Sequence, residues 1–240
     1  MPNIITDGET YIGNRADGII LIIANDVTAD GDAGDDLLTA RIETSNVWIE
    51  EYPTAAVNTI EGGGGDDRIT GVVSLGETFD ETGEFRSELY GREGDDLITA
   101  RGGFDNILVG NQDDDTLRGS GSTDRLIGGQ GADVLSGGGG ADEFVFEGPR
   151  GETSERDQIL AFTQGEDKFD ISAIDANVFQ GGNQRFSFDD GTGSGHAWVE
   201  EDPDSNGSLL YADNGRGVLV VSIRDGGMDA SDYEASDFLL

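Results

Sequence analysis

Aspartate residues recur in this sequence at a regular spacing, and each lies two residues before a large apolar side chain. The clearest copies are residues 128–136 (GGQGADVLS) and 137–145 (GGGGADEFV), which share the pattern G-G-x-G-x-D-x-U-x, where U is a large apolar residue. Carboxylates are hard oxygen ligands for divalent cations, and they also act as acids and bases in catalysis. The register of the aspartates indicates which of these two chemistries applies.

The pattern occurs eight times. Six copies run almost unbroken from 91 to 145, with Val109 as a one-residue insertion, and two more lie at 31–39 and 62–70. The sixth position is aspartate in every copy, at Asp36, Asp67, Asp96, Asp105, Asp115, Asp124, Asp133 and Asp142. The eighth position is always large and apolar, at Leu38, Ile69, Ile98, Ile107, Leu117, Leu126, Leu135 and Phe144. A flexible linker does not require an aspartate and an apolar residue at fixed spacing, so the copies are structural repeats.

The elements that position the aspartates follow from the same repeat. Glycines permit the positive φ of a tight turn, and the x-U-x segment forms a short strand whose middle side chain points inward. Two repeats then make one coil of a flattened right-handed solenoid, and successive coils stack about 4.8 Å apart. The sequence therefore predicts an all-β fold, a right-handed parallel β-roll.

Stacking the coils brings the aspartates into rows along the edges of the roll. Two carboxylates about 4.8 Å apart repel each other by roughly 3.5 kcal/mol at an effective dielectric constant of 20. A divalent cation between successive coils reverses the sign of this interaction, and crowded turn carbonyls complete a shell of oxygen ligands. Oxygen ligands on flexible loops, without nitrogen or sulfur, favour calcium over zinc. The sequence therefore predicts several Ca²⁺ ions as cofactors.

The predicted metal ligands are the eight sixth-position aspartates and six glycines of the turns. The glycines occupy the second or fourth position of their repeats and are Gly65, Gly94, Gly129, Gly131, Gly138 and Gly140. Residues 202–207 with Asp213 have the spacing of an EF-hand loop, but the SLLYAD segment that follows predicts a strand instead of a helix. A polar β-turn is the favoured interpretation of that segment.

The composition excludes several classes of function. With 50 acidic and 14 basic residues the net charge is −36, so nucleic acid and an anionic membrane surface are not expected partners. The longest early apolar run, residues 19–24, is too short to span a bilayer, so we expect no membrane insertion. The chain has no cysteine, which excludes disulfides and thiolate metal sites.

Catalytic constellations are scarce. His196 is the only histidine, which rules out the H-E-x-x-H motif of zinc proteases, and we expect it to be structural or exposed. The G-x-S-x-G pattern occurs only in broken form, at residues 119–122. Acidic residues occur throughout, but the repeat already accounts for their placement. We therefore predict that the chain is not an enzyme and has no catalytic residue.

The nonapeptides resemble those of the RTX family, the hemolysin-type calcium-binding repeats, whose copies form calcium-loaded parallel β-rolls. In that family each ion lies between turns n and n+2 on the same edge. The resemblance implies that one edge of the roll is lined by Asp96, Asp115 and Asp133. It implies that the other edge is lined by Asp105, Asp124 and Asp142, although two turn glycines before Asp105 are replaced.

Residues 144–177 resemble the domain that follows the roll in serralysin-type secreted proteases and in mannuronan epimerase modules. The matching elements include Phe144-Val145-Phe146, Asp157-x-Ile159 and Phe162. The last residues, 236–240 (SDFLL), are similar to the uncleaved signal of that family for type I secretion. The resemblance implies a type I exporter as partner and an extracellular, secreted or cell-surface location in a Gram-negative bacterium. We expect the last four residues to serve export without being needed for folding.

These features divide the chain into three regions: 1–90, an irregular N-terminal part of the roll with inserted loops or hairpins; 91–146, the regular roll; and 147–240, a serralysin-like C-terminal cap and secretion region. The N-terminal inserts carry four aromatic residues that either cover the roll or form an exposed contact surface, namely Trp48, Tyr52, Phe79 and Phe85. The aromatic residues expected to cover the last coil are Phe162, Phe169, Phe179, Phe186 and Phe188.

The sequence thus predicts a secreted, non-enzymatic calcium-binding protein that serves as a calcium-dependent structural module of the cell surface or matrix. The alternative is a carbohydrate-binding module similar to epimerase R-modules. Beyond calcium and the exporter, the partners to consider are an extracellular polysaccharide and a second copy of the chain. The net charge argues against a polyanionic glycan unless calcium bridges the two.

Overall fold

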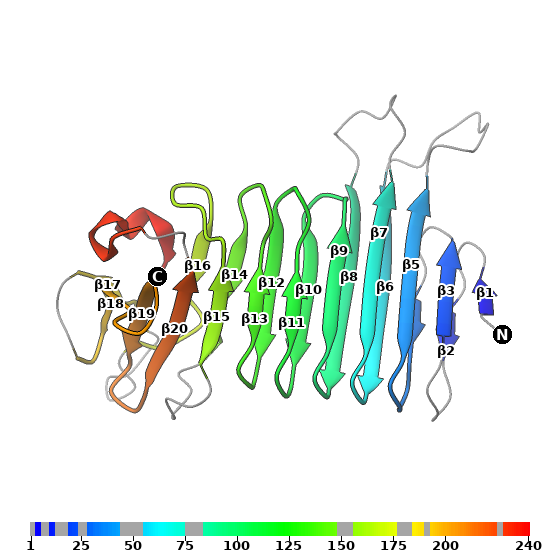
Figure 1. Cartoon of the computed structure of the whole chain (residues 1–240), viewed down its shortest axis with the longest axis horizontal. Coiled ribbons are helices and arrows are strands. Elements are labelled where there is room, and N and C mark those ends of the chain that lie inside the picture. Colours follow the sequence, from blue (N-terminus) through cyan, green and yellow to red (C-terminus); the bar gives the residue numbers. More distant parts are fainter. Residues whose placement is uncertain are drawn as a thin grey trace.

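The computed structural model describes residues 3–5, 10–12, 19–23, 28–43, 55–74, 84–147, 156–176, 184–189, 193–224 and 228–240. Within these ranges the chain winds as a roll between two facing sheets, here called sheet A and sheet B (Figure 1). Successive strands alternate between the sheets, and the described pairs from β1 to β16 are parallel. The predicted all-β, parallel β-roll is confirmed.

The two sheets differ in how they end. Sheet A contains, in spatial order, β1 (Asn3–Ile5), β3 (Ile19–Ile23), β5 (Leu37–Glu43), β7 (Arg68–Ser74), β9 (Leu97–Arg101), β11 (Thr116–Arg118), β13 (Val134–Ser136), β15 (Asp157–Leu160), β20 (Val218–Arg224), β19 (Ser208–Asp213), β18 (His196–Glu201) and β17 (Ser187–Phe188). Sheet B contains β2 (Thr10–Ile12), β4 (Thr28–Asp30), β6 (Ala55–Gly64), β8 (Glu84–Glu93), β10 (Asn106–Asn111), β12 (Asp124–Gly129), β14 (Glu143–Val145), β16 (Lys168–Asp170) and β21 (Phe238–Leu239). Sheet A becomes antiparallel from β20 to β18, whereas sheet B stays parallel to its last strand.

Each sheet contributes a row of apolar side chains to the core, with one fully buried residue per coil. The row of sheet A is Leu38, Ile69, Ile98, Leu117, Leu135 and Ile159. The row of sheet B is Ile60, Leu89, Leu108, Leu126, Phe144 and Phe169. Every eighth-position residue of the repeats except Ile107 belongs to these rows, because the side chain two residues after the sixth position points inward.

One repeat has a different register from the predicted one. In β10 Leu108 is fully buried, while Ile107 is half-buried and faces outward. Asn106 therefore occupies the sixth position and Asp105 is exposed, so the inserted residue is Ala100 and not Val109. The prediction for Asp105 and Ile107 is wrong by one residue, because two apolar residues in succession fit the eighth position equally well.

The two isolated repeats join the same stack, since β5 pairs with β7 and β7 pairs with β9. The coils here are wider, and a second, smaller core cluster is formed by Ala56, Val73 and Phe85. Phe85 is thus a core residue and not part of an exposed contact surface. Trp48, Tyr52 and Phe79 lie outside the described residues.

Past the repeats, the chain adds one more coil and then closes both sheets. Phe162 stacks on Phe169 with ring centroids 4.3 Å apart, and Phe186 and Phe188 join the same core cluster. Of the aromatic residues expected to cover the last coil, only Phe179 lies outside the described ranges. Tyr233, which was not among the predicted aromatic residues, also packs against Phe162.

The last residues of the chain form part of this closure. Phe238 is 5% exposed, pairs with Phe169 across β16 and β21, and stacks on Phe188 with ring centroids 4.2 Å apart. Asp237 is also buried and accepts a hydrogen bond from the Glu234 N–H. The expectation that the last four residues are dispensable for folding conflicts with this arrangement, because they supply the final strand of sheet B.

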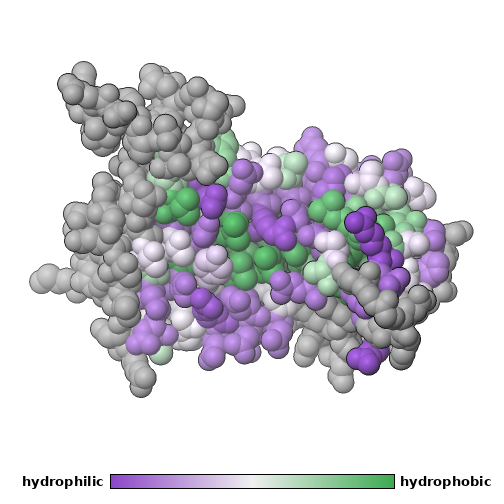
Figure 2. Space-filling view, turned by 180° about the vertical axis from the view of Figure 1, so that it is seen from behind, coloured by the Kyte–Doolittle hydropathy of each residue, from purple (hydrophilic) through white to green (hydrophobic). Residues whose placement is uncertain are grey.

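Along the regular coils the strand side chains alternate between buried positions, which face the core, and half-buried positions on the outer faces. On the outer face of sheet B, hydrophobic residues lie along the roll among hydrophilic ones (Figure 2). They include Ile107, Val109 and Ile127, all half-buried. The helices within the described ranges, η1 (Ala230–Asp232) and η2 (Ala235–Asp237), are too short to cross a membrane.

The place of Phe238 in the core predicts a clear loss of stability on truncation of its side chain. Phe238→Ala should lower the free energy of unfolding in calcium by about 3–5 kcal/mol, as for other buried phenylalanines. Urea denaturation measures this change. Leu239→Ala is the matched control, because Leu239 is 41% exposed, and it should change stability by less than about 0.5 kcal/mol. Equal effects of the two substitutions would show that β21 does not close the roll.

Candidate metal sites

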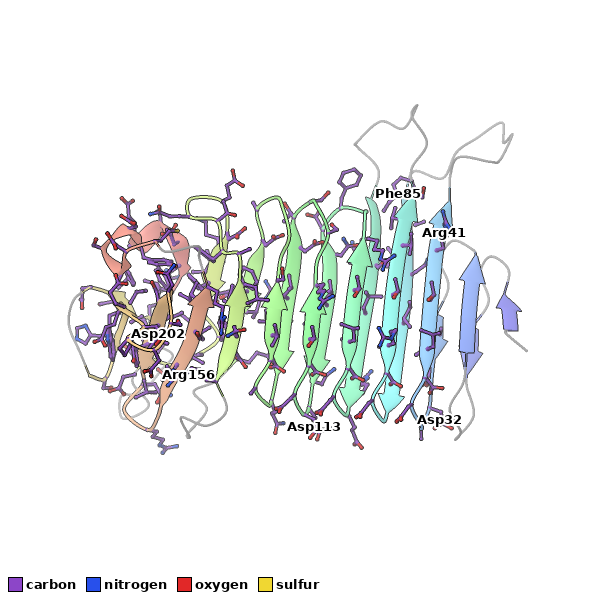
Figure 3. All side chains as sticks on the ribbon, in the orientation of Figure 1. Asp32, Arg41, Phe85, Asp113, Arg156 and Asp202 are labelled. Atoms are coloured by element: carbon purple, nitrogen blue, oxygen red, sulfur yellow. The ribbon has the colours of Figure 1, made fainter. Side chains whose placement is uncertain are left out.

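The first edge of the roll comprises the turns that lead from sheet B to sheet A, and it carries one buried aspartate per coil. The row is Asp36, Asp67, Asp96, Asp115, Asp133 and Asp157. The backbone N–H of each aspartate donates a hydrogen bond to Oδ1 of the next, with N···O distances from 2.7 to 3.0 Å. Figure 3 shows this edge along the lower side of the roll, where Asp32 and Asp113 are labelled. The structure therefore joins the two isolated repeats and the regular repeats in one continuous row.

The second carboxylate oxygen of these aspartates is the feature that points to a cation. Oδ2 of Asp67, Asp96 and Asp115 is buried and has no hydrogen-bond partner. A Cβ on Gly62 would lie 2.2 Å from Asp67 Oδ2 and 2.8 Å from the Gly91 carbonyl oxygen. Carboxylate and carbonyl oxygens thus converge where the glycine leaves no side chain. This donor set fits a hard divalent cation, which would satisfy the buried oxygens.

The six turn glycines predicted as ligands share one backbone conformation. Their φ angles all lie between +100° and +119°. A Cβ on Gly94 would lie 2.3 Å from the carbonyl oxygen of Gly65 in the neighbouring coil, which shows how closely the turns approach each other. Glycine is needed there because both the positive φ and the close approach exclude a side chain. Their carbonyls are in place as candidate ligands, and contact with an ion remains a prediction.

Burial makes row aspartates weaker acids than usual. It raises the pKa of Asp67 to about 6, that of Asp96 to about 7 and that of Asp115 to about 8. Neighbouring carboxylates of the same edge raise these pKa values further, while the backbone N–H donors lower them. Without an ion, these carboxyls therefore hold protons close to neutral pH, and a cation has to compete with those protons.

The second edge comprises the turns that lead from sheet A to sheet B, and its row changes character along the roll. Toward the C-terminus it holds Asp124, Asp142 and Asp167, joined by N–H···Oδ1 hydrogen bonds of 2.9 Å. Toward the N-terminus the aligned residues are the buried and neutral Asn58, Ser87 and Asn106. The prediction that Asp105 lines this edge is therefore wrong.

Two members of the rows were not among the predicted ligands. Asp157 and Asp167 are both 2% exposed and accept the N–H of Asp133 and Asp142, respectively. Their turns lack the glycine pattern, so the search for nonapeptides passes over them. The signal that identifies them is the spacing to Ile159 and Phe169, an aspartate two residues before a buried apolar side chain.

Other candidate sites from the sequence do not assemble. Asp202 accepts hydrogen bonds from the Asp204 N–H and the Ser205 hydroxyl in the turn between β18 and β19, while Asp213 lies at the far end of β19. This is a polar turn, as favoured above. His196 Nδ1 lies 2.8 Å from Asp189 Oδ1 in an exposed pair. Among the described residues, no three His, Cys, Asp or Glu side chains gather around a single point, so each ion would depend on turn carbonyls as well as row carboxylates.

Comparison with known proteins decides the family. The family model described as Peptidase M10 serralysin C terminal matches residues 23–214. The chain belongs to this family. The match corresponds to the C-terminal repeat region of serralysin, of the RTX type, and not to its catalytic part.

The solved structures that match this chain share little sequence with it. The AlgE6R2 subunit of the mannuronan C5-epimerase from Azotobacter vinelandii is 22% identical, with 80% of this chain and 94% of that chain covered and a TM-score of 0.41. The extracellular lipase LipA from Serratia marcescens is 18% identical, with 97% of this chain and 40% of that chain covered and a TM-score of 0.42. No protein of curated function matches this sequence.

The orphaned oxygens of the first edge predict that its aspartates control calcium affinity. Asp115→Asn keeps the acceptor for the Asp96 N–H but removes the charge, so the calcium midpoint should rise roughly tenfold, or about 1.4 kcal/mol. Calcium titration followed by circular dichroism measures this midpoint. Asp105→Asn removes the same charge from an exposed residue outside both rows and should leave the midpoint unchanged. A larger shift for Asp105→Asn would overturn the register described above.

The raised pKa values predict how the ion-free protein responds to pH. These carboxyls titrate near 3.8 when unfolded but keep their protons up to about pH 6 to 8 when folded, so the folded state binds more protons in that window. The free energy of unfolding should therefore fall as pH rises. In chelator the circular dichroism β signal should be greater at pH 5 than at pH 8, and saturating calcium at pH 8 should restore the signal. Greater stability at pH 8 in chelator would argue against buried carboxylate rows.

Proposed function

We propose that this chain is a non-enzymatic structural module that a type I system exports and that calcium folds outside the cell. The observation that carries the proposal is the first-edge row, in which Oδ2 of Asp67, Asp96 and Asp115 is buried without a partner. Membership of the serralysin C-terminal family supports it, because this family corresponds to the repeat region and not to the protease.

The roles of the residues in this proposal follow from their positions. The N–H···Oδ1 hydrogen bonds set the spacing between coils and hold each carboxylate in the row. Calcium would supply the positive charge between successive carboxylates, and the turn carbonyls would complete its oxygen shell. Where calcium is scarce, those row carboxyls that are ionised have no counter-charge and repel one another, which opposes stacking and leaves the chain open for export. Where calcium is abundant, the coils stack and the C-terminal strands close the roll.

The proposal predicts that the whole roll depends on calcium. In chelator the far-ultraviolet β signal should be largely lost, and calcium at about 10⁻⁴–10⁻³ M, typical of extracellular modules, should restore it. Magnesium should substitute poorly because it requires a tighter octahedral shell. Circular dichroism of the full chain measures both. The same β signal in chelator and in calcium would contradict the proposal.

A second function is favoured by one observation, the clustering of positive charge on the outer face of sheet A. Four of the 14 basic residues, all exposed, point outward from neighbouring strands β5, β7, β9 and β11, namely Arg41, Arg68, Arg101 and Arg118. Figure 3 labels Arg41 at one end of this group. Such a face suits an anionic polysaccharide even though the net charge is strongly negative.

This second function predicts binding that depends on the arginine face. The full chain in calcium should bind an acidic polysaccharide, and the double substitution Arg68→Glu with Arg118→Glu should weaken binding at least tenfold. Arg216→Glu, an exposed arginine in the turn between β19 and β20, is the charge-matched control and should have little effect. Surface plasmon resonance at several salt concentrations measures these affinities. Binding that is insensitive to the double substitution would assign the glycan to another surface. No binding by the unmodified chain would exclude this second function.

A further inference from the structure

The second edge contains a side chain that makes the contacts expected of a cation. Asn106 is fully buried and occupies the sixth position of its coil, where Asp124 and Asp142 lie in the next two coils. Its Oδ1 accepts the N–H of Ser87 at 2.9 Å. This is the same hydrogen bond that Oδ1 of each first-edge aspartate accepts. Asn106 therefore takes part in the row as an aspartate would, with one half of its side chain.

The other half of the side chain differs from an aspartate. Nδ2 of Asn106 donates to the carbonyl oxygen of Gly102 at 3.0 Å and to Asp124 Oδ1 at 2.7 Å, and it lies 3.4 Å from the Ser120 hydroxyl. The surrounding network fixes the orientation of the amide, because Oδ1 faces an N–H donor while Nδ2 faces only acceptors. These acceptors are a turn carbonyl of its own coil, a carboxylate of the next coil and a hydroxyl.

This set of oxygens matches the one that converges on the first edge. There, turn carbonyls and row carboxylates lie together, and the Oδ2 atoms of Asp67, Asp96 and Asp115 have no partner. At Asp124, in contrast, both oxygens are satisfied: Oδ1 by Asn106 and Oδ2 by the Ser120 N–H at 2.5 Å. Because Asn106 Oδ1 accepts the row N–H, its Nδ2 holds the place of the Oδ2 that these three first-edge aspartates leave without a partner, and it brings hydrogens of partial positive charge there.

We propose that the amide of Asn106 replaces a calcium ion between its coil and the coil of Asp124. The inference rests on the proposed function, in which calcium occupies the aspartate rows. Toward the N-terminus the row is neutral as well, since Ser87 is aligned with Asn58, and no described residue of this half of the row carries a charge. The first edge would then bind ions along its whole length, and the second edge only from Asp124 onward.

The test is to restore the carboxylate and count the ions. Asn106→Asp has nearly the same shape and pairs a second carboxylate with Asp124, so the full-length variant should bind one more calcium ion per chain than the unmodified protein. Native mass spectrometry in calcium, checked by equilibrium dialysis with ⁴⁵Ca²⁺, gives the count. Thr99→Glu adds the same charge on the outer face of sheet A, in the middle of β9 and away from the turns, and should leave the count unchanged. An unchanged count for Asn106→Asp would overturn the inference.

A second measurement uses the unmodified chain, so it does not depend on how the variant folds. A crystal structure grown in calcium should show Nδ2 of Asn106 within hydrogen-bond distance of Gly102 O and Asp124, with no ion between them. A calcium ion bound to Gly102 O and Asp124 at about 2.3–2.6 Å would overturn the inference while leaving the proposed function intact. A chain that binds no calcium on either edge would overturn the proposed function, and this inference with it.

Discussion

Stacking a repeat with aspartate at its sixth position places carboxylates above one another at the spacing of β-strands, and the rest of this structure depends on how that charge is compensated. The backbone hydrogen bond to Oδ1 holds each carboxylate in its row, and burial there raises its pKa although the hydrogen bond itself lowers it. The remaining oxygen is left without a partner at Asp67, Asp96 and Asp115. The regular stacking of the coils therefore creates a row of carboxylates on the first edge, and the chain itself supplies no partner for the second oxygens of these three aspartates.

The apolar core is arranged by the same stacking, with one row of residues from each sheet. The last residue of such a row has to be covered by a further side chain. In sheet B, Phe238 covers Phe169 and pairs with it across β16 and β21. Sheet A ends instead in β20 and the antiparallel strands β19 and β18. The residues that resemble an export signal thus also belong to the folded core. Under the proposed function, an exporter would reach this segment only while the roll is open, so export would have to precede calcium-dependent folding.

Much of the roll could be predicted from the sequence because position and chemistry repeat together. Seven of the eight aspartates and their apolar partners lie where the repeat puts them. The register failed at Asp105, where an adjacent asparagine and two successive apolar residues allowed two frames, and only burial distinguishes Leu108 from Ile107. Asp157 and Asp167 were not predicted because the turns before them lack the G-G-x-G pattern of the repeats. The part played by Phe238 depends on contacts across nearly 70 residues of chain, which local spacing does not encode.

The central claim is that cations hold successive coils together, and hydrogen–deuterium exchange of the full chain tests it most directly. The backbone amides of β9, β11 and β13 lie in the regular roll and pair only with neighbouring coils. The account predicts strong protection of all three strands in calcium and its loss in all three together when calcium is chelated. Protection that persists unchanged in chelator would show that the coils stay stacked without ions, and it would contradict the account.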